Sequence, residues 1–116
     1  MQEVGEQPWP SYAYKPDVKF SIAHTDEHIL LAFKVREAEV RYVNTMPNSA
    51  VWEESCVEFF ISFDDRGYYN FEFNCIGTVL VGFGKDRNDR KLLPETLVKR
   101  VECFSFMNEA KGDNKW

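Results

Sequence analysis

Apolar and polar residues alternate along several stretches of this 116-residue chain, a period of two that is typical of β-strands with one buried face. After an extended, proline-rich lead-in over residues 1–17, the alternation is clear over residues 18–23. It returns over residues 29–37, beyond the polar turn HTDEH at residues 24–28. These two stretches predict an antiparallel hairpin.

A second hairpin is predicted in the sequence CVEFFISFDDRGYYNFEFNC, residues 56–75. Its first strand alternates an apolar set with a mixed set, and its second strand alternates aromatic residues with asparagine and glutamate. One face of this hairpin is therefore expected to be apolar. The other face carries the polar residues Glu58, Ser62, Asn70, Glu72 and Asn74.

The register of the second hairpin can be argued from its faces, because a slip of one residue would mix them. The apolar sets stay together when Asp64 lies opposite Tyr68 and residues 65–67 form a three-residue loop. A loop of this class takes a left-handed residue at its third position, where the sequence has glycine. In this register Glu58 lies opposite Asn74.

The rest of the chain adds shorter elements. Residues 38–50 form an irregular loop, residues 78–83 a further strand, and residues 85–93 a charged connection in which the run 85–91 is expected to be solvated. Residues 94–101 predict a short helix, with proline in its first turn and apolar residues at helical spacing. Residues 102–106 are predicted to form one more short strand.

Five or six strands and one short helix near 94–101 predict an all-β fold. Sheets that each need one face covered favour an antiparallel β-sandwich, of the immunoglobulin-like or DOMON-like kind. The length suits one domain. Few strands are left for a second sheet, so we expect residues 1–116 to be a single domain whose remaining strands lie beyond Trp116.

Charge and composition narrow the classes of partner. The net charge is -5 and no basic block is present, which argues against nucleic acid and anionic membranes as partners. No apolar run is long enough to span a bilayer. The first ten residues lack the basic start and apolar stretch of a signal peptide, so the compartment is open. A periplasmic or extracellular location is expected if the natural start is missing.

Cysteines and histidines give little support for a metal or cofactor. Three widely spaced cysteines argue against a metal site or a disulfide framework, and we expect them to be buried thiols. His24 and His28 flank Asp26 in a turn that is better explained by solvation than by metal binding. The two acids Asp64 and Asp65 fall short of a calcium site. We therefore expect no cofactor, although structural calcium stays possible.

Four residues of the second hairpin region supply the groups that sugar recognition needs. A sugar requires an aromatic surface for its C–H side and charged or amide groups for its hydroxyls. Trp52 supplies the aromatic surface, and Glu58, Glu72 and Asn74 supply the polar groups. Each also has a simpler explanation. Trp52 would cover the sheet, the glutamates would be solvated, and Asn74 would tie down the following turn.

The run WEESCVEFFI at 52–61, followed by YNFEFN at 69–74 and by Gly77, resembles the core signature of family 9 carbohydrate-binding modules. In particular it resembles the family-9-like proteins of Bacteroides-type bacteria. The segment at 9–35 is similar too, so the resemblance covers nearly the whole chain. It implies a β-sandwich related to DOMON-like domains, and non-catalytic binding of a saccharide or glycan, often at a chain end.

The resemblance also implies roles for individual residues. Trp52 would stack on the sugar and Glu58 would bond its hydroxyls. Asn74 matches an asparagine of the family, whereas Glu72 stands where xylanase-attached members have an arginine. A second stacking tryptophan is implied in a C-terminal segment beyond this chain, and some members hold structural calcium.

Two other functions stay open. Glu58 and Glu72 would lie diagonally across the hairpin, roughly 7 Å apart, since Phe60 is expected opposite Glu72. Paired carboxylates at such a separation serve glycoside hydrolases. Alternatively, the chain is an interaction or structural domain without a ligand, because exposed strand edges invite pairing with another chain or a second copy.

Overall fold

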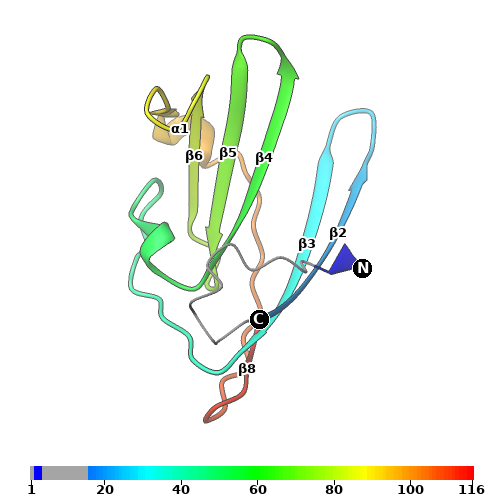
Figure 1. Ribbon diagram of the computed structural model, residues 1–116, viewed down its shortest axis with the longest axis vertical. Coiled ribbons are helices and arrows are strands. Elements are labelled where there is room, and N and C mark those ends of the chain that lie inside the picture. Colours follow the sequence, from blue (N-terminus) through cyan, green and yellow to red (C-terminus); the bar gives the residue numbers. More distant parts are fainter. Residues whose placement is uncertain (1, 4–15) are drawn as a thin grey trace. The chain divides into compact units, whose positions relative to one another are not determined.

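The computed structural model describes residues 2–3 and 16–116, so most of the predicted lead-in over 1–17 lies outside the described residues. The chain divides into two compact units (Figure 1). The first comprises Met1–Val40 and Met107–Trp116, and the second comprises Arg41–Phe106. Each unit is built around one antiparallel sheet. The all-β class is confirmed, with two antiparallel sheets as a β-sandwich contains.

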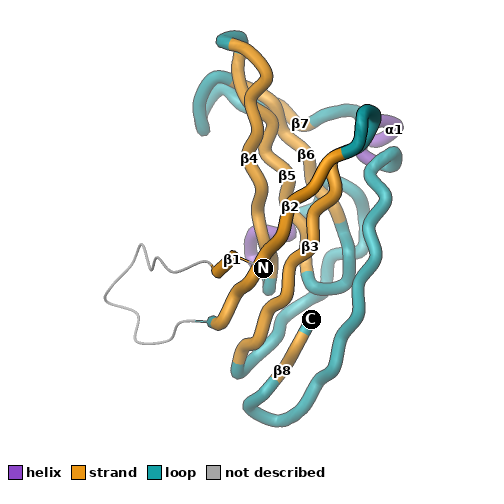
Figure 2. Tube along the Cα trace, turned by 90° about the vertical axis from the view of Figure 1, so that its right-hand side faces the viewer, coloured by secondary structure: helices purple, strands orange, loops and turns teal. Residues whose placement is uncertain are grey.

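The sheet of the first unit has the strand order β1-β2-β3-β8. Its strands are β1 (Gln2–Glu3), β2 (Asp17–His24), β3 (Ile29–Glu37) and β8 (Asn114–Lys115). The predicted first hairpin is confirmed as β2 and β3, which pair along their full lengths and place their apolar residues opposite one another. Figure 2 shows β2 and β3 running side by side as a long hairpin, and β8 pairs with β3.

The sheet of the second unit has the strand order β4-β5-β6-β7. Its strands are β4 (Cys56–Asp64), β5 (Gly67–Asn74), β6 (Val79–Gly84) and β7 (Lys91–Leu92). The short 3-10 helix η1 (Val51–Glu53) precedes β4, and the helix α1 (Glu95–Val98) follows β7. In Figure 1 the strands β4, β5 and β6 lie side by side, with η1 at the end of the sheet where β4 begins.

The observed register of the second hairpin differs from the predicted one. Glu58 lies opposite Glu72, rather than opposite Asn74, and a bulge between Ile61 and Asp64 shifts the pairing. Both registers keep the two faces apart because they differ by two residues, and side chains alternate with that same period. The argument from faces therefore could not distinguish them, and the inferred loop length was wrong.

The bulge is stabilised at the tip of the hairpin, where Asp64 pairs with Gly67 across a two-residue loop. The hydroxyl Oγ of Ser62 lies 2.7 Å from the carbonyl oxygen of Asp64 and 2.6 Å from that of Gly67. The backbone N–H of Arg66 donates to the Asp64 carboxylate at 2.9 Å. Gly67 has a positive φ of 154° and begins β5, instead of closing a three-residue loop.

Alternation gives this second sheet an apolar face and a polar face. On the apolar face, the core cluster consists of Val79, Val81 and Val98, packed against Tyr69, Phe71, Phe73, Leu93 and Val101. Val98 comes from α1 and is 2% exposed, so the short helix covers part of this face. We call the opposite surface the polar face; it is formed by Cys56, Glu58, Phe60, Tyr68, Asn70, Glu72 and Asn74.

Several short elements differ from the sequence-based expectations. The helix predicted near 94–101 is confirmed but spans only Glu95–Val98, with Pro94 just before it. The strand predicted over 102–106 is wrong, since those residues form no strand. Two-residue strands appear instead at Lys91–Leu92 and Asn114–Lys115. Such short strands are defined by backbone pairing alone, and two residues are too few for an alternation of side chains that would predict them.

The cysteines form no disulfide among the described residues, which confirms that they are thiols. Cys75 is buried as expected, but Cys56 is half-buried and Cys103 is exposed. Among the same residues, no helix has the length and apolar character needed to cross a membrane. The expectation of a single domain continuing beyond Trp116 stays a prediction.

We expect Gly84→Ala to destabilise the protein by about 1–3 kcal/mol, the usual effect of overpacking. A Cβ at Gly84 would lie 2.5 Å from the carbonyl oxygen of Asp89 and 2.7 Å from the Cα of Arg90, both backbone atoms that cannot easily move. Gly82→Ala is the matched control, because its Cβ would meet nothing closer than 3.7 Å. Urea unfolding measures both variants, and equal midpoints would contradict the prediction.

Candidate functional site

The polar face brings Glu58 and Glu72 together as direct cross-strand partners. The Glu58 side chain is exposed, whereas Glu72 is only 6% exposed. The pKa of Glu72 is raised to about 7, and burial is the main cause. A hydrogen bond with Glu58 and the negative charge of Glu58 raise this pKa further. The positive charge of Arg90 acts in the opposite direction and lowers it. Glu72 therefore keeps its proton up to about neutral pH.

Arg90 reaches the polar face from the connection between β6 and β7. Its guanidinium carbon Cζ lies 6.0 Å from the ring centre of Phe60 and 5.9 Å from that of Tyr68. The two rings are themselves 5.9 Å apart. These distances are those of cation–π contacts. The expectation that the charged run 85–91 is a solvated connection is therefore wrong for Arg90, which is half-buried.

A sequence signal for this contact did exist. Gly82 and Gly84 alternate within β6, and glycine within a strand often marks a close approach of another backbone. The backbone of Asp89 and Arg90 does approach Gly84, within distances that a side chain there would not allow. The glycines thus permit the connection to fold back and place Arg90 on the polar face.

Trp52 lies in η1, immediately before β4, and its side chain is 55% exposed. The preceding Val51 is fully buried, and η1 packs against β4 and β5. Val51 therefore anchors the short helix while the indole of Trp52 faces outward. A large aromatic side chain with this exposure is available to a ligand.

Asn74 uses its side chain within the protein, where it is 2% exposed. Its amide nitrogen Nδ2 donates to the carbonyl oxygen of Asn44 and to Glu54 Oε2, both at 2.9 Å. Its oxygen Oδ1 accepts from the backbone N–H groups of Ile76 and Thr78, at 3.2 and 2.8 Å. The simpler explanation, that Asn74 ties down the following turn, is thus confirmed. An amide can make about four hydrogen bonds, so none is left for a ligand.

Glu54 is a residue that the sequence did not single out. Its Oε1 accepts hydrogen bonds from the backbone N–H groups of Val43 and Asn44, both at 2.8 Å, and from Asn44 Nδ2 at 2.6 Å. Partial burial acts to raise the pKa of Glu54, but the hydrogen bonds, led by that from Asn74, hold this pKa below its usual value. No sequence signal separates Glu54 from the neighbouring, exposed Glu53.

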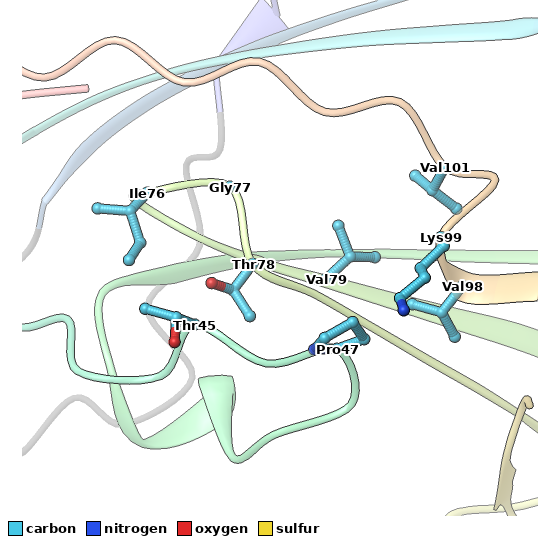
Figure 3. A pocket seen from close by; sticks show the side chains of 9 residues that line it. All are labelled: Thr45, Pro47, Ile76, Gly77, Thr78, Val79, Val98, Lys99 and Val101. Carbon is cyan, nitrogen blue, oxygen red and sulfur yellow. The ribbon is translucent and has the colours of Figure 1, made fainter. Parts of the chain in front are cut away.

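A hollow of about 310 Å³ also lies in the second unit, but none of the predicted site residues line it. Figure 3 shows that β6, the loop before η1 and the segment around α1 surround it. Its lining residues are Thr45, Pro47, Ile76, Gly77, Thr78, Val79, Val98, Lys99 and Val101. Lys99 is paired with Glu95 at 2.9 Å, and the Thr78 hydroxyl donates to the carbonyl oxygen of Asn44. This hollow therefore offers few unengaged polar groups to a sugar.

The sequence of the chain matches the model of carbohydrate-binding family 9 over residues 1–116. The chain belongs to this family. Comparison with curated proteins yields no match. Family 9 membership supports carbohydrate binding by a module without a catalytic role.

A solved structure of a candidate carbohydrate-binding protein from Bacteroides uniformis is similar to the family 9 chain. The two share 39% sequence identity with a TM-score of 0.82, over 98% of the family 9 chain. The family 9 chain spans 56% of the length of the Bacteroides protein. Similarity at this level extends to fold and sequence together.

Metal binding has little support in the family 9 chain. Within residues 16–116 no group of three or more histidine, cysteine, aspartate or glutamate side chains is arranged to hold a metal ion. The Asp64 carboxylate is already paired with Arg66 Nη2, at 2.6 Å. The idea of structural calcium thus gains no ligand set from this part of the molecule.

We expect the free energy of unfolding of the family 9 chain to fall as pH rises from about 4.5 to about 7. Over this range Glu72 ionises in the unfolded chain but keeps its proton in the folded chain. A raised folded-state pKa means that the folded chain retains a proton that the unfolded chain has lost, so rising pH favours unfolding. Glu72→Gln removes this loss, which we place at about 2–3 kcal/mol. Urea unfolding of both proteins across this pH range measures it, and parallel curves would contradict the prediction.

Glu54→Gln should lower the free energy of unfolding at pH 7 by about 1–3 kcal/mol, because an amide nitrogen would face donors that the carboxylate now satisfies. The lowered pKa means that Glu54 stabilises the fold above its usual pKa and loses this effect as pH falls through the folded-state value. The difference from the wild type should therefore narrow in acid. Exposed Glu53→Gln is the matched control, and equal thermal melting of both variants would argue against the prediction.

Proposed function

We propose that this chain binds a saccharide without catalysis, with Trp52 stacked on the sugar ring and Glu58 hydrogen-bonded to its hydroxyls. The observation that carries this proposal is the exposure of both side chains, six residues apart, in a chain that belongs to carbohydrate-binding family 9. Both residues lie in the second unit: Trp52 is in η1, just before β4, and Glu58 is near the start of β4.

The chemistry of Trp52 supports its proposed role. An indole that is 55% exposed leaves a large apolar surface in water, which is unfavourable unless a ligand covers it. The C–H side of a sugar ring is apolar and flat enough to cover such a surface. Val51, fully buried beside it, keeps the short helix in place during binding.

The carboxyl pair supports the proposed role of Glu58. The raised pKa keeps Glu72 protonated near neutral pH, so that it can donate a hydrogen bond to Glu58 directly opposite and orient that exposed side chain on the polar face. Sugar hydroxyls that donate to a carboxylate form charge-assisted bonds, which are stronger than neutral ones. We assign Glu72 this orienting role. For Asn74 we propose an indirect role, through the turn and the Glu54 carboxylate that it holds.

The same pairing disfavours glycoside hydrolysis. A retaining hydrolase needs carboxyl groups about 5–5.5 Å apart, and an inverting one needs still more, so that the sugar or a water fits between them. In this pair Glu72 is only 6% exposed, so a glycosidic bond has no access to both carboxyl groups in this arrangement.

Interaction through a strand edge is the second candidate function. In the strand order of the second sheet, the nine-residue β4 stands at an edge. An edge strand of this length can pair with an extended segment of another chain or with a second copy. Self-association without any response to sugars would favour this function over saccharide binding.

Titration of the full chain with a panel of saccharides, followed by tryptophan fluorescence, tests the proposal. We expect quenching with at least one sugar, its loss in Trp52→Ala, and an affinity about 10- to 100-fold lower in Glu58→Gln, the effect of losing a hydrogen bond to a charged group. Exposed Glu102→Gln is the matched control and should bind as the wild type does.

Two outcomes would count against the proposal. If no sugar of the panel changes the tryptophan fluorescence of the folded wild type, the proposed saccharide binding is wrong. Release of a hydrolysis product that stops in Glu58→Gln would replace binding by catalysis. Circular dichroism of each variant confirms that loss of quenching is not loss of fold.

A further inference from the structure

Two buried side chains on the polar face, those of Asn70 and Glu72, each have one polar atom without a hydrogen-bond partner among the described residues. Asn70 is 2% exposed and Glu72 is 6% exposed. Among the described residues, neither Asn70 Nδ2 nor Glu72 Oε2 has a hydrogen-bond partner. Buried polar atoms are almost always paired, so each such atom needs an explanation. Neither Asn70 nor this oxygen of Glu72 is used in the sugar contacts proposed above.

The two atoms have complementary chemistry and lie near one another. Asn70 and Glu72 are two residues apart on β5, so their side chains share a face at a spacing of roughly 7 Å along the strand. The Asn70 amide needs an acceptor, and the Glu72 oxygen needs a donor. A carboxylate or phosphate ligand has only acceptors and would satisfy Asn70 alone. Neighbouring hydroxyls of a sugar each donate and accept, and therefore suit both atoms.

Arg90 covers the position of Asn70. In the sheet, Asn70 lies between Phe60 on β4 and Gly82 on β6. The Cβ of Arg90 would be 4.0 Å from a Cβ built on Gly82, and its Cζ lies 6.0 Å from the ring centre of Phe60. The side chain thus crosses from one neighbour of Asn70 to the other. Cation–π contacts at exposed rings are weak, so a ligand can displace this side chain.

We propose that Asn70 and Glu72 form a further contact point of the saccharide site, where two neighbouring hydroxyls of a pyranose bond Asn70 Nδ2 and Glu72 Oε2 after Arg90 moves aside. This inference rests on the proposed saccharide binding, extends it to Asn70, which the family signature did not single out, and gives Glu72 a direct contact with the sugar. Phe60, 51% exposed, then lies beside the bound sugar as an apolar neighbour. Arg90 is a displaceable cover and contributes no bond to the ligand in this scheme.

Nuclear magnetic resonance of the ¹⁵N-labelled wild type tests the contact directly. The probes are the methyl pyranosides of glucose, galactose, mannose and xylose, with their monodeoxy analogues. The side-chain amide signal of Asn70, identified by sequential assignment, should shift with the same midpoint as the fluorescence quenching. At least one monodeoxy analogue should bind about 5- to 20-fold more weakly and leave this signal in place, since it lacks one hydrogen bond.

Variants provide the second measurement. Asn70→Ser and Glu72→Leu should each bind the parent sugar about tenfold more weakly, with little further loss for the matched deoxy analogue. Glu72→Gln should bind about as the wild type does, because its amide keeps an acceptor for the sugar hydroxyl. Arg90→Ala should bind the parent sugar two- to five-fold more tightly, because no cation–π contact is displaced. Asn88→Ser, at an exposed asparagine of the same connection, is the control and should bind normally.

The outcomes separate this inference from the proposed function. Quenching at Trp52 without any shift at Asn70, and with equal affinities for parent and deoxy sugars, overturns the inference and leaves saccharide binding intact. No response to any sugar overturns both. If Asn70→Ser does not fold, the wild-type shift and the deoxy sugars still decide.

Discussion

The direct pairing of Glu58 with Glu72 across β4 and β5 is the constraint from which the chemistry of the polar face follows. Burial of Glu72 is the main cause that raises its pKa to about 7. The carboxyl group of Glu58 directly opposite acts in the same direction, because like charges opposite one another in a sheet are unfavourable. The result is one exposed carboxyl group beside one buried carboxyl group that keeps its proton up to about neutral pH. A diagonal arrangement would instead have left two independent, solvated carboxylates.

A network of hydrogen bonds around Asn74 and Glu54 fixes the position of Trp52. Asn74 and Glu54 connect the end of β5, the turn after it and the loop before η1 through hydrogen bonds of 2.6–2.9 Å. None of these groups needs to touch a ligand to matter. They hold the backbone on either side of Trp52, so that exposure of the indole does not depend on a mobile loop. Binding surfaces carried by loops need such support because loops lack regular backbone pairing.

The connection between β6 and β7 shows how glycine shapes a surface. A side chain at Gly84 would meet the backbone of Asp89 and Arg90, so its absence allows the connection to turn back over the sheet. Arg90 then lies across Phe60 and Tyr68 and lends a positive charge to a face otherwise dominated by carboxyl groups. The polar face thereby combines aromatic, amide, carboxyl and guanidinium groups within three strands and one connection.

The sequence by itself determined the long strands, their two faces and the family, because alternation and the motif around Trp52 and Glu58 are local in the chain. It also predicted the strand that contains Glu58, β4, with Trp52 just before it. Only the tertiary structure decided the pairing of Glu58 with Glu72, since a period of two cannot distinguish registers that differ by two residues. The roles of Glu54 and Arg90 likewise depend on contacts between segments distant in sequence, for which no local pattern of side chains carries information.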